Sequence, residues 1–74
     1  MSISDKAIQK LKGNNRAIAR LMIEFDRGQA TIENWMNAKD VRLTTPSAVT
    51  IISTETGLSQ DEVLEPVAAT VEQN

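Results

Sequence analysis

Residues that begin and end helices recur at short intervals along this chain of 74 residues. Ser, Thr and Asn stand before apolar runs, where a side-chain oxygen can accept a hydrogen bond from a free N–H of the first helical turn. Glycines stand after such runs, where helices commonly stop. The boundary residues, in chain order, are Ser4, Gly13, Asn14 or Asn15, Gly28, Thr45, Gly57 and Ser59. This pattern predicts an all-α fold, a small bundle of five short helices.

The second and third predicted helices carry the clearest inward faces. In the second, apolar side chains follow the i, i+3, i+4, i+7 spacing of a buried stripe, namely Ile18, Leu21, Met22 and Phe25. The third lies in "GQATIENWMN", residues 28–37, and its apolar side consists of Ile32, Trp35 and Met36. Gly28, between the two helices, is expected to adopt the positive φ of a tight turn. The pair is therefore expected to form a helix-turn-helix.

Thr45 and Pro46 begin the fourth helix, because proline suits the first helical position. The β-branched cluster at 49–52 would also suit a strand, but the helix-breaking residues on either side favour the helix. In the polar connection before this helix, Val41 and Leu43 are expected to pack back onto the core.

The last short helix begins at "SQDE", residues 59–62, which has the sequence of a capping box. Pro66 prevents that helix from continuing, because the residue before a proline disfavours helical backbone angles. We assign residues 1–66 to one helix-turn-helix domain. Residues 67–74 form a C-terminal tail, for which a disordered segment and a small dimer contact remain alternatives.

The amino-acid composition excludes several kinds of site. The chain has neither cysteine nor histidine, which excludes disulfides, thiolate or imidazole metal ligands and the usual catalytic triads. Its carboxylates are mostly scattered singly and are not clustered as calcium ligands are. We expect no enzyme activity, no cofactor and no metal. No apolar run approaches the length of a membrane span and no signal-peptide core follows Met1, which indicates a cytoplasmic protein.

Charge is divided unevenly along the chain. All eight basic residues lie in positions 1–42 with five carboxylates, whereas positions 43–74 hold five carboxylates and no cation. The net charge of −2 is therefore the sum of +3 over residues 1–42 and −5 over residues 43–74. Such asymmetry can present a positive face to a nucleic acid and an acidic face on the other side. Ordinary solvated helix faces are the alternative interpretation.

A helix-turn-helix can read DNA because an α-helix fits the major groove, where base edges present distinct patterns of donors and acceptors. Its first helix crosses the sugar-phosphate backbone while its second helix enters the groove. Amide side chains suit base contact, since Gln and Asn can bond adenine at N6 and N7 together. Gln29, at the start of the third predicted helix, lies where such a group is needed.

At these residues the chain resembles the Cro/repressor-type (lambda repressor-like) helix-turn-helix domain of phage and bacterial regulators. The resemblance rests on "NRAIARL" followed by "QATIENWMNAKDVRLTTPSAVTIISTETGLSQDEVLE" and covers roughly residues 4–65. Ile18 and Ala19 match the family's "LA" pair, and "ATIENW" matches its "STISRW" segment. The stretch from Gly57 to Leu64 matches its closing "G-hydrophobic-S-x-D-E-hydrophobic-L". From Ile18 to Trp35 this chain has about three more residues than the family pattern, so its second helix or its turn must be longer.

The resemblance implies a sequence-specific transcriptional regulator that binds double-stranded DNA. A homodimer is expected, because one small module offers too little interface for high specificity. The recognition helix would span about residues 29–37, and its base-contacting side chains would be Gln29, Ala30, Glu33 and Asn34. The side chains that would contact phosphates are Asn15, Arg16, Arg27, Lys39 and Arg42.

Several alternatives stay open. The acidic net charge and the position of Glu33 also suit a protein-interaction module, such as an antirepressor or accessory factor that keeps the scaffold without binding DNA. Glu33 itself either accepts a hydrogen bond from cytosine N4 or pairs with Lys39 or Arg27 across a turn. Trp35 is expected to brace the third helix at the core or its rim, in preference to contacting phosphate.

Overall fold

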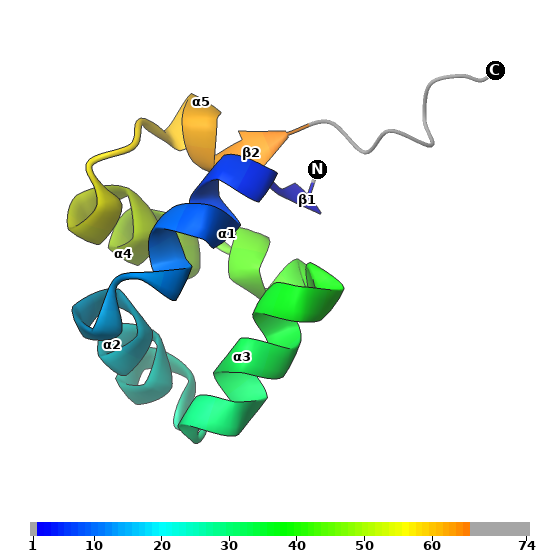
Figure 1. Ribbon diagram of the computed structural model, residues 1–74, viewed down its shortest axis with the longest axis vertical. Helices are drawn as coiled ribbons and strands as arrows, with labels where there is room; N and C mark the ends of the chain where they lie inside the picture. The colour runs from blue at the N-terminus through cyan, green and yellow to red at the C-terminus, as the bar shows by residue number, and fades with distance from the viewer. Residues whose placement is uncertain (1, 66–74) are drawn as a thin grey trace, which may run out of the picture.

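The computed structural model describes residues 2–65, which form a compact and mostly helical domain (Figure 1). The elements are β1 (Ser2–Ile3), α1 (Asp5–Lys12), α2 (Asn15–Phe25), α3 (Gln29–Ala38), the 3₁₀ helix η1 (Val41–Thr44), α4 (Pro46–Thr56), α5 (Gln60–Val63) and β2 (Leu64–Glu65). The prediction of a small domain with five α-helices is confirmed. The predicted tail, residues 67–74, lies outside the described residues.

Three of the predicted caps form as side-chain hydrogen bonds. The Ser4 hydroxyl oxygen accepts from the Ala7 N–H at 3.1 Å. Of the two candidate asparagines, Asn14 is the cap, and its Oδ1 accepts from the Ala17 N–H at 3.0 Å. Its Nδ2 also donates to the Glu55 carbonyl at 2.9 Å, so one residue begins α2 and ties it to the end of α4. These bonds satisfy N–H groups that a helix leaves free at its start.

The capping box at the start of α5 is confirmed, because the Ser59 and Glu62 side chains each accept from the other's backbone N–H. The Glu62 carboxylate also binds the Lys6 ammonium of α1 at 2.7 Å. The Lys6 contact, followed by the Ser59 backbone contact, lowers the pKa of Glu62 from its ordinary 4.5 to about 2. One side chain therefore stabilises α5 internally and links it to α1.

The expectation for Gly28 is wrong. Its φ is −76°, an ordinary value, and the left-handed residue of this turn is Asp26 with a φ of 54°. Asp26 ends α2 because its N–H reaches the Ile23 carbonyl at 3.3 Å, and aspartate is one of the few side chains that tolerate this conformation. Gly28 instead stands in extended backbone as the residue before α3. Gly57, with a φ of 79°, is the glycine that takes the left-handed form.

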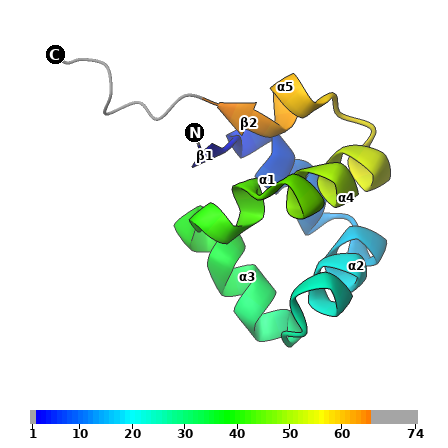
Figure 2. The same ribbon diagram turned by 180° about the vertical axis from the view of Figure 1, so that it is seen from behind.

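The fourth helix lies at the centre of the core. Figure 2 shows α4 crossing in front of α1, with α5 above it and α2 below it. Its inward side chains are buried, namely Ala48, Val49, Ile51 and Ile52. They meet the buried stripe of α2, of which Ile18 and Leu21 are buried while Met22 and Phe25 lie half-buried against the core. The helical interpretation of the β-branched cluster is confirmed.

The connection before α4 behaves differently at its two apolar residues. Leu43 in η1 is fully buried, as expected, but Val41 is 72% exposed. A tight 3₁₀ turn spaces neighbouring side chains about 120° apart, so the side chains at positions i and i+2, here Val41 and Leu43, cannot both face the core. The prediction that Val41 packs inward is therefore wrong.

The two ends of the described chain are joined by a short antiparallel strand pair that the sequence did not predict. Ser2 pairs with Glu65 and Ile3 pairs with Leu64. The helix before β2 ends at Val63, whose carbonyl accepts from the Ser4 N–H at 2.8 Å. Strands of two residues are too short to show an alternating pattern. Within residues 2–65, no helix combines the length and the apolar character that crossing a membrane requires.

The left-handed conformation of Gly57 predicts a measurable asymmetry between two glycines. We expect Gly57→Ala to lower the free energy of unfolding by about 1–2 kcal/mol, because a Cβ strains a positive φ even though no atom lies within 4 Å of it. Gly13→Ala is the matched control, since Gly13 has a φ of −99° and equally open surroundings. It should be neutral or stabilising by about 0.5 kcal/mol. Urea unfolding followed by Trp35 fluorescence measures both, and equal effects would contradict the assignment.

The link between α1 and α5 predicts a pH dependence of stability. Since the pKa of Glu62 is lower in the folded protein, its contribution is complete above about pH 4.5 and is lost as the pH falls towards 2. The melting temperature of Glu62→Gln should therefore lie below that of the wild type at pH 6, and the difference should shrink as the pH falls from 4.5 to 2. Lys6→Gln should reduce the wild-type slope in the same window. A difference that stays constant across that window would show that Glu62 contributes without its charge.

Candidate nucleic-acid interface

The candidate interface is built on α2, α3 and the turn between them. The turn has only three residues, Asp26 to Gly28, and the helix before it, α2, has eleven. The two helices diverge from it in a V (Figure 1). A short turn of this kind lets α2 cover the buried side of α3 and leaves the other side of α3 in solvent.

The buried side of α3 is anchored by two core residues and one aromatic residue at the rim. Ile32 and Met36 are buried, and Trp35 is half-buried against the core. The Trp35 ring forms a T-shaped contact with the ring of Phe25, at the end of α2, with centroids 5.2 Å apart and planes at 87°. The guanidinium of Arg42, in η1, lies 5.1 Å from the centre of the same ring. Trp35 therefore joins α2, α3 and η1, and these contacts hold α3 at a defined angle.

The solvent side of α3 carries the predicted base-contacting residues. All four are exposed, namely Gln29, Ala30, Glu33 and Asn34, and Asn37 continues the same side one turn further on. The Gln29 amide Nε2 donates to Glu33 Oε2 at 3.0 Å. Among residues 2–65 no ion pair joins Glu33 to Lys39 or Arg27, so the alternative that Glu33 pairs across a turn is wrong.

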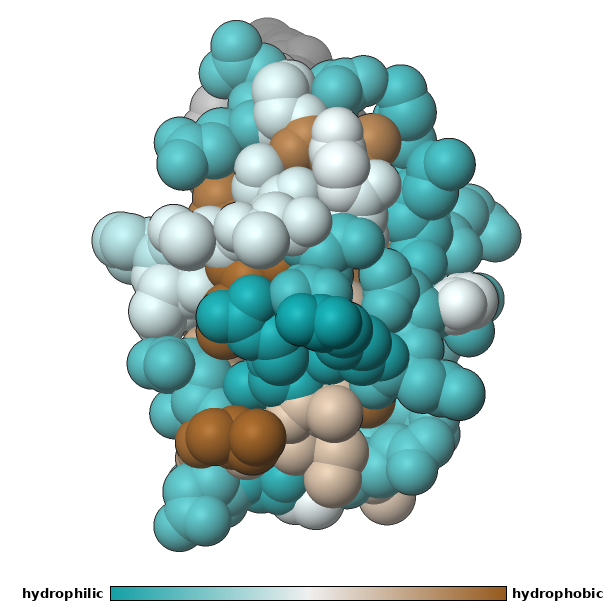
Figure 3. Space-filling view, turned by 90° about the vertical axis from the view of Figure 1, so that its left-hand side faces the viewer, coloured by the Kyte–Doolittle hydropathy of each residue, from teal (hydrophilic) through white to brown (hydrophobic). Residues whose placement is uncertain are grey.

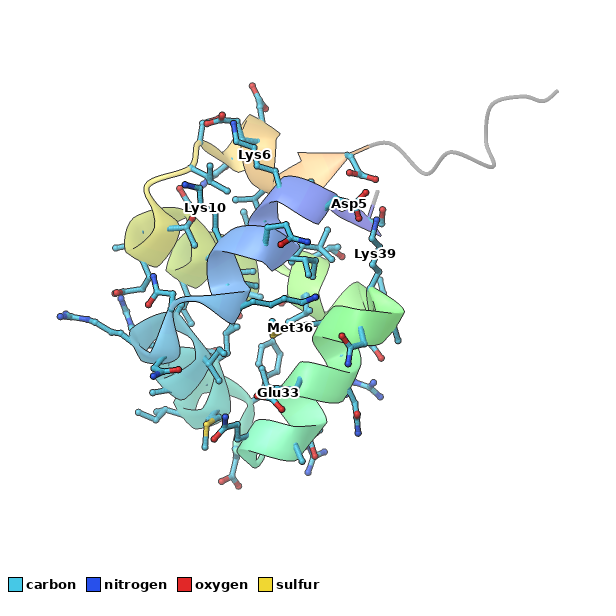
Figure 4. The ribbon with its side chains drawn as sticks, viewed as in Figure 1. Asp5, Lys6, Lys10, Glu33, Met36 and Lys39 are labelled. Carbon is cyan, nitrogen blue, oxygen red and sulfur yellow. The ribbon has the colours of Figure 1, made fainter. Side chains whose placement is uncertain are left out.

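A hollow of about 250 Å³ lies beside α3, where it faces the end of α1 and the start of α2. Its lining residues are Lys12, Ile18, Glu33, Met36 and Asn37. Figure 4 shows Glu33 and Met36 on the side of α3 that faces the other two helices. Its rim is polar and its floor is apolar.

Within the described part of the chain, no three carboxylates are grouped closely enough to hold a metal ion.

The hollow contains two residues that sequence reasoning missed. Asn37 could have been found, because it follows Glu33 at the four-residue spacing of one helix face. Lys12 carried no such signal, because only the packing of α1 against α2 brings it next to α3.

Of the five predicted phosphate-contacting residues, two lie exposed near the ends of α2. Asn15 is the first residue of that helix, and Arg27 lies in the turn immediately before α3. Neither side chain makes an ion pair or a side-chain hydrogen bond to another residue in the range 2–65. Both side chains can therefore meet a ligand without first leaving a partner.

Arg16 belongs to an ion-pair cluster that connects α2 to α4. Its Nε lies 3.1 Å from Glu55 Oε1, and Arg20 Nη1 lies 2.8 Å from Glu55 Oε2. The Glu55 side chain is only 10% exposed, whereas that of Arg16 is 81% exposed. Strongly hydrophilic side chains gather at the centre of the face that carries α2 and α4 (Figure 3). Since Arg20 remains with Glu55, Arg16 can turn outwards without leaving that carboxylate unpaired.

Lys39 and Arg42 are engaged within the molecule. Lys39 Nζ lies 2.6 Å from an Asp5 oxygen and 3.6 Å from a Glu65 oxygen, and the hydrogen bond to Asp5 raises the pKa of Lys39. Figure 4 shows Lys39 beside Asp5, at the opposite end of α3 from the turn. Arg42 binds Asp40 at 3.0 Å in addition to its contact with Trp35. The sequence grouped these two cations with the interface, but both also have structural roles.

Comparison with protein-family models, with curated proteins and with solved structures gives no match to this chain. Its function must therefore be inferred from its own geometry. That geometry consists of an exposed polar helix face, a tryptophan behind it that braces the helix, and two cations, Lys12 and Arg27, that form no ion pair within residues 2–65.

The position of Trp35 predicts that it stabilises the whole domain. We expect Trp35→Ala to lower the free energy of unfolding by about 2–3 kcal/mol, somewhat less than a fully buried tryptophan, because its contacts with Phe25 and Arg42 are lost. The neighbouring Asn34→Ala, at an exposed position, should change it by less than about 0.5 kcal/mol. Urea unfolding followed by circular dichroism measures both. A loss below about 1 kcal/mol for Trp35→Ala would show that α3 is held without it.

Proposed function

We propose that this domain is a sequence-specific DNA-binding regulator of the phage or bacterial repressor type, with α3 as its recognition helix. The observation that carries the proposal is the division of α3 into two sides. One side is fixed by Ile32, Met36 and Trp35, and the other exposes four polar side chains and the methyl groups of two alanines to solvent. A helix that is anchored and exposed in this way suits insertion into the major groove.

The order of the elements supports the lambda repressor-like type. A helix precedes the α2–turn–α3 unit, a polar connection with a short 3₁₀ helix follows it, and α4 and α5 complete the core. The sequence resemblance implies the same order. In this arrangement α2 would cross the duplex backbone, and Asn15 with the free N–H groups at its start would meet a phosphate.

The distribution of cations supports a modest phosphate-binding surface. Arg27 precedes α3, Lys12 lies across the hollow from it, and Arg16 is largely exposed at the start of α2. We assign phosphate contacts to these three residues first. Lys39 and Arg42 would contribute only if their intramolecular partners were exchanged for phosphate, so binding should be weaker than in a strongly basic domain.

A salt titration of DNA binding tests the proposal. Fluorescence anisotropy with labelled random-sequence duplex at about 50 mM salt should show binding, and the logarithm of the affinity should fall by about 0.9 for each phosphate contact per tenfold rise in salt. Arg27→Ala should weaken binding to all sequences and reduce that slope by about 1. Lys6→Ala removes a cation that is paired with Glu62 at the far end of α1, and should leave the slope unchanged.

Selection from a random duplex pool tests sequence specificity. Gln29→Ala should cost about 1–3 kcal/mol on the selected site and relax the preference at one base pair, because a bidentate amide contact is lost. Two copies of the chain per selected site are expected, with half-sites related by two-fold symmetry. Equal losses on selected and random duplex for Gln29→Ala would contradict base readout.

The second candidate is a protein-interaction module on the same scaffold. The observation that favours it is the number of cations already paired with carboxylates, since Lys39 binds Asp5 and Glu65 while Arg42 binds Asp40. If the wild-type chain does not bind duplex DNA at about 50 mM salt, or its affinity does not fall as salt rises, this second function replaces the first.

A further inference from the structure

Glu33 lies at the edge of the exposed side of α3, where that side borders the hollow, and a negative charge there is unexpected in a DNA-binding surface. The residue is exposed, and within residues 2–65 it forms no ion pair. Its one side-chain hydrogen bond is accepted from the Gln29 amide, which orients the carboxylate. Lys12 lies across the hollow and offsets part of the charge without binding it. Within the described residues, the carboxylate therefore keeps its other oxygen, Oε1, without a hydrogen bond or an ion pair.

A free carboxylate on a groove-facing helix restricts which base it can meet. Phosphates repel it, as do the acceptor atoms of guanine and thymine, which present O6 with N7 and O4 respectively. The amino groups that donate in the major groove are cytosine N4 and adenine N6. Adenine also presents the acceptor N7 next to its amino group, so the second carboxylate oxygen would face another acceptor there. Cytosine has no such neighbour, which favours it as the partner of Glu33.

The bond between the two side chains leaves Gln29 able to act as well. One of its two amide hydrogens is donated to Glu33, and the other hydrogen and the carbonyl oxygen remain available. That remaining pair of one donor and one acceptor complements adenine N7 and N6. Residues four apart on a helix are separated by about 6 Å along its axis, and base pairs are stacked about 3.4 Å apart. The two residues would therefore read base pairs within about two steps of each other.

We propose that Glu33, oriented by Gln29, is a specificity-determining residue that selects cytosine in the target site, with an adenine selected by Gln29 within two base pairs. This inference rests on the proposed DNA-binding function and adds the chemistry of the sequence that α3 reads. The carboxylate lowers affinity for random DNA and raises discrimination, because only a base that donates a hydrogen bond compensates its charge.

Selection from a random duplex pool with three proteins tests the proposal. The wild type should prefer cytosine at one position by about tenfold over guanine or thymine. Glu33→Gln should bind random duplex more tightly, because a charge that repels phosphate is removed, and its preference at that position should change from cytosine to adenine. Asp61→Asn is the matched control. It removes an exposed carboxylate on α5, away from α3, and should keep the cytosine preference.

The outcomes separate this inference from the function on which it rests. If the wild type binds DNA with a salt-dependent affinity but Glu33→Gln selects the same sequence, the inference fails and the DNA-binding function stands. A wild-type preference for guanine or thymine opposite Glu33 overturns it as well. If no protein of the three binds duplex, both proposals fail. Circular dichroism of Glu33→Gln verifies that this exposed substitution leaves the fold intact.

Discussion

The packing of α4 into the middle of the domain is the contact on which the other elements depend. A chain of this size without disulfides must bury most of its apolar side chains in one core, and α4 supplies Ala48, Val49, Ile51 and Ile52 to it. The helices α1, α2 and α5 each pack against it. Three polar contacts at its end strengthen the joint with α2, because the Glu55 carbonyl accepts from Asn14 and the Glu55 carboxylate pairs with Arg16 and Arg20. The position of α2 then determines where α3 begins.

The helix α3 is largely exposed because only a few of its side chains pack into the core. Two buried residues and the half-buried Trp35 hold it, and a three-residue turn connects it to α2. Because Trp35 contacts both Phe25 and Arg42, the helix is braced at its inner side by elements that precede and follow it in the chain. The side chains on its outer side do not pack against the core, which is the physical basis for proposing that side as the recognition surface.

The distribution of charge along the sequence differs from the charge that the folded molecule presents on its surface. The basic first part of the chain suggests a continuous positive face, but five of the eight cations pair with carboxylates within residues 2–65, and Lys10, Lys12 and Arg27 do not. Lys39 is the clearest case. This residue ends α3 in the left-handed conformation, and its side chain binds Asp5 and Glu65. Those two carboxylates lie near the two ends of the described chain, where β1 pairs with β2. The positive charge near α3 is correspondingly smaller and depends more on Arg27 and Lys12.

The sequence alone determined the helices, the starts of two of them at Ser4 and Ser59, and the exposed side of α3, because capping bonds and helical periodicity join residues three or four positions apart. It left Asn14 and Asn15 open as the cap of α2, and the structure decided for Asn14. The sequence also indicated that Trp35 would brace α3, since its spacing matches that of Ile32. Only the tertiary structure decided that β1 pairs with β2, that Lys12 meets the hollow beside Glu33 and that Lys39 turns away from the interface. Those contacts join residues that are 20 or more positions apart, and no local pattern encodes which of several equally charged side chains will meet once the core has closed.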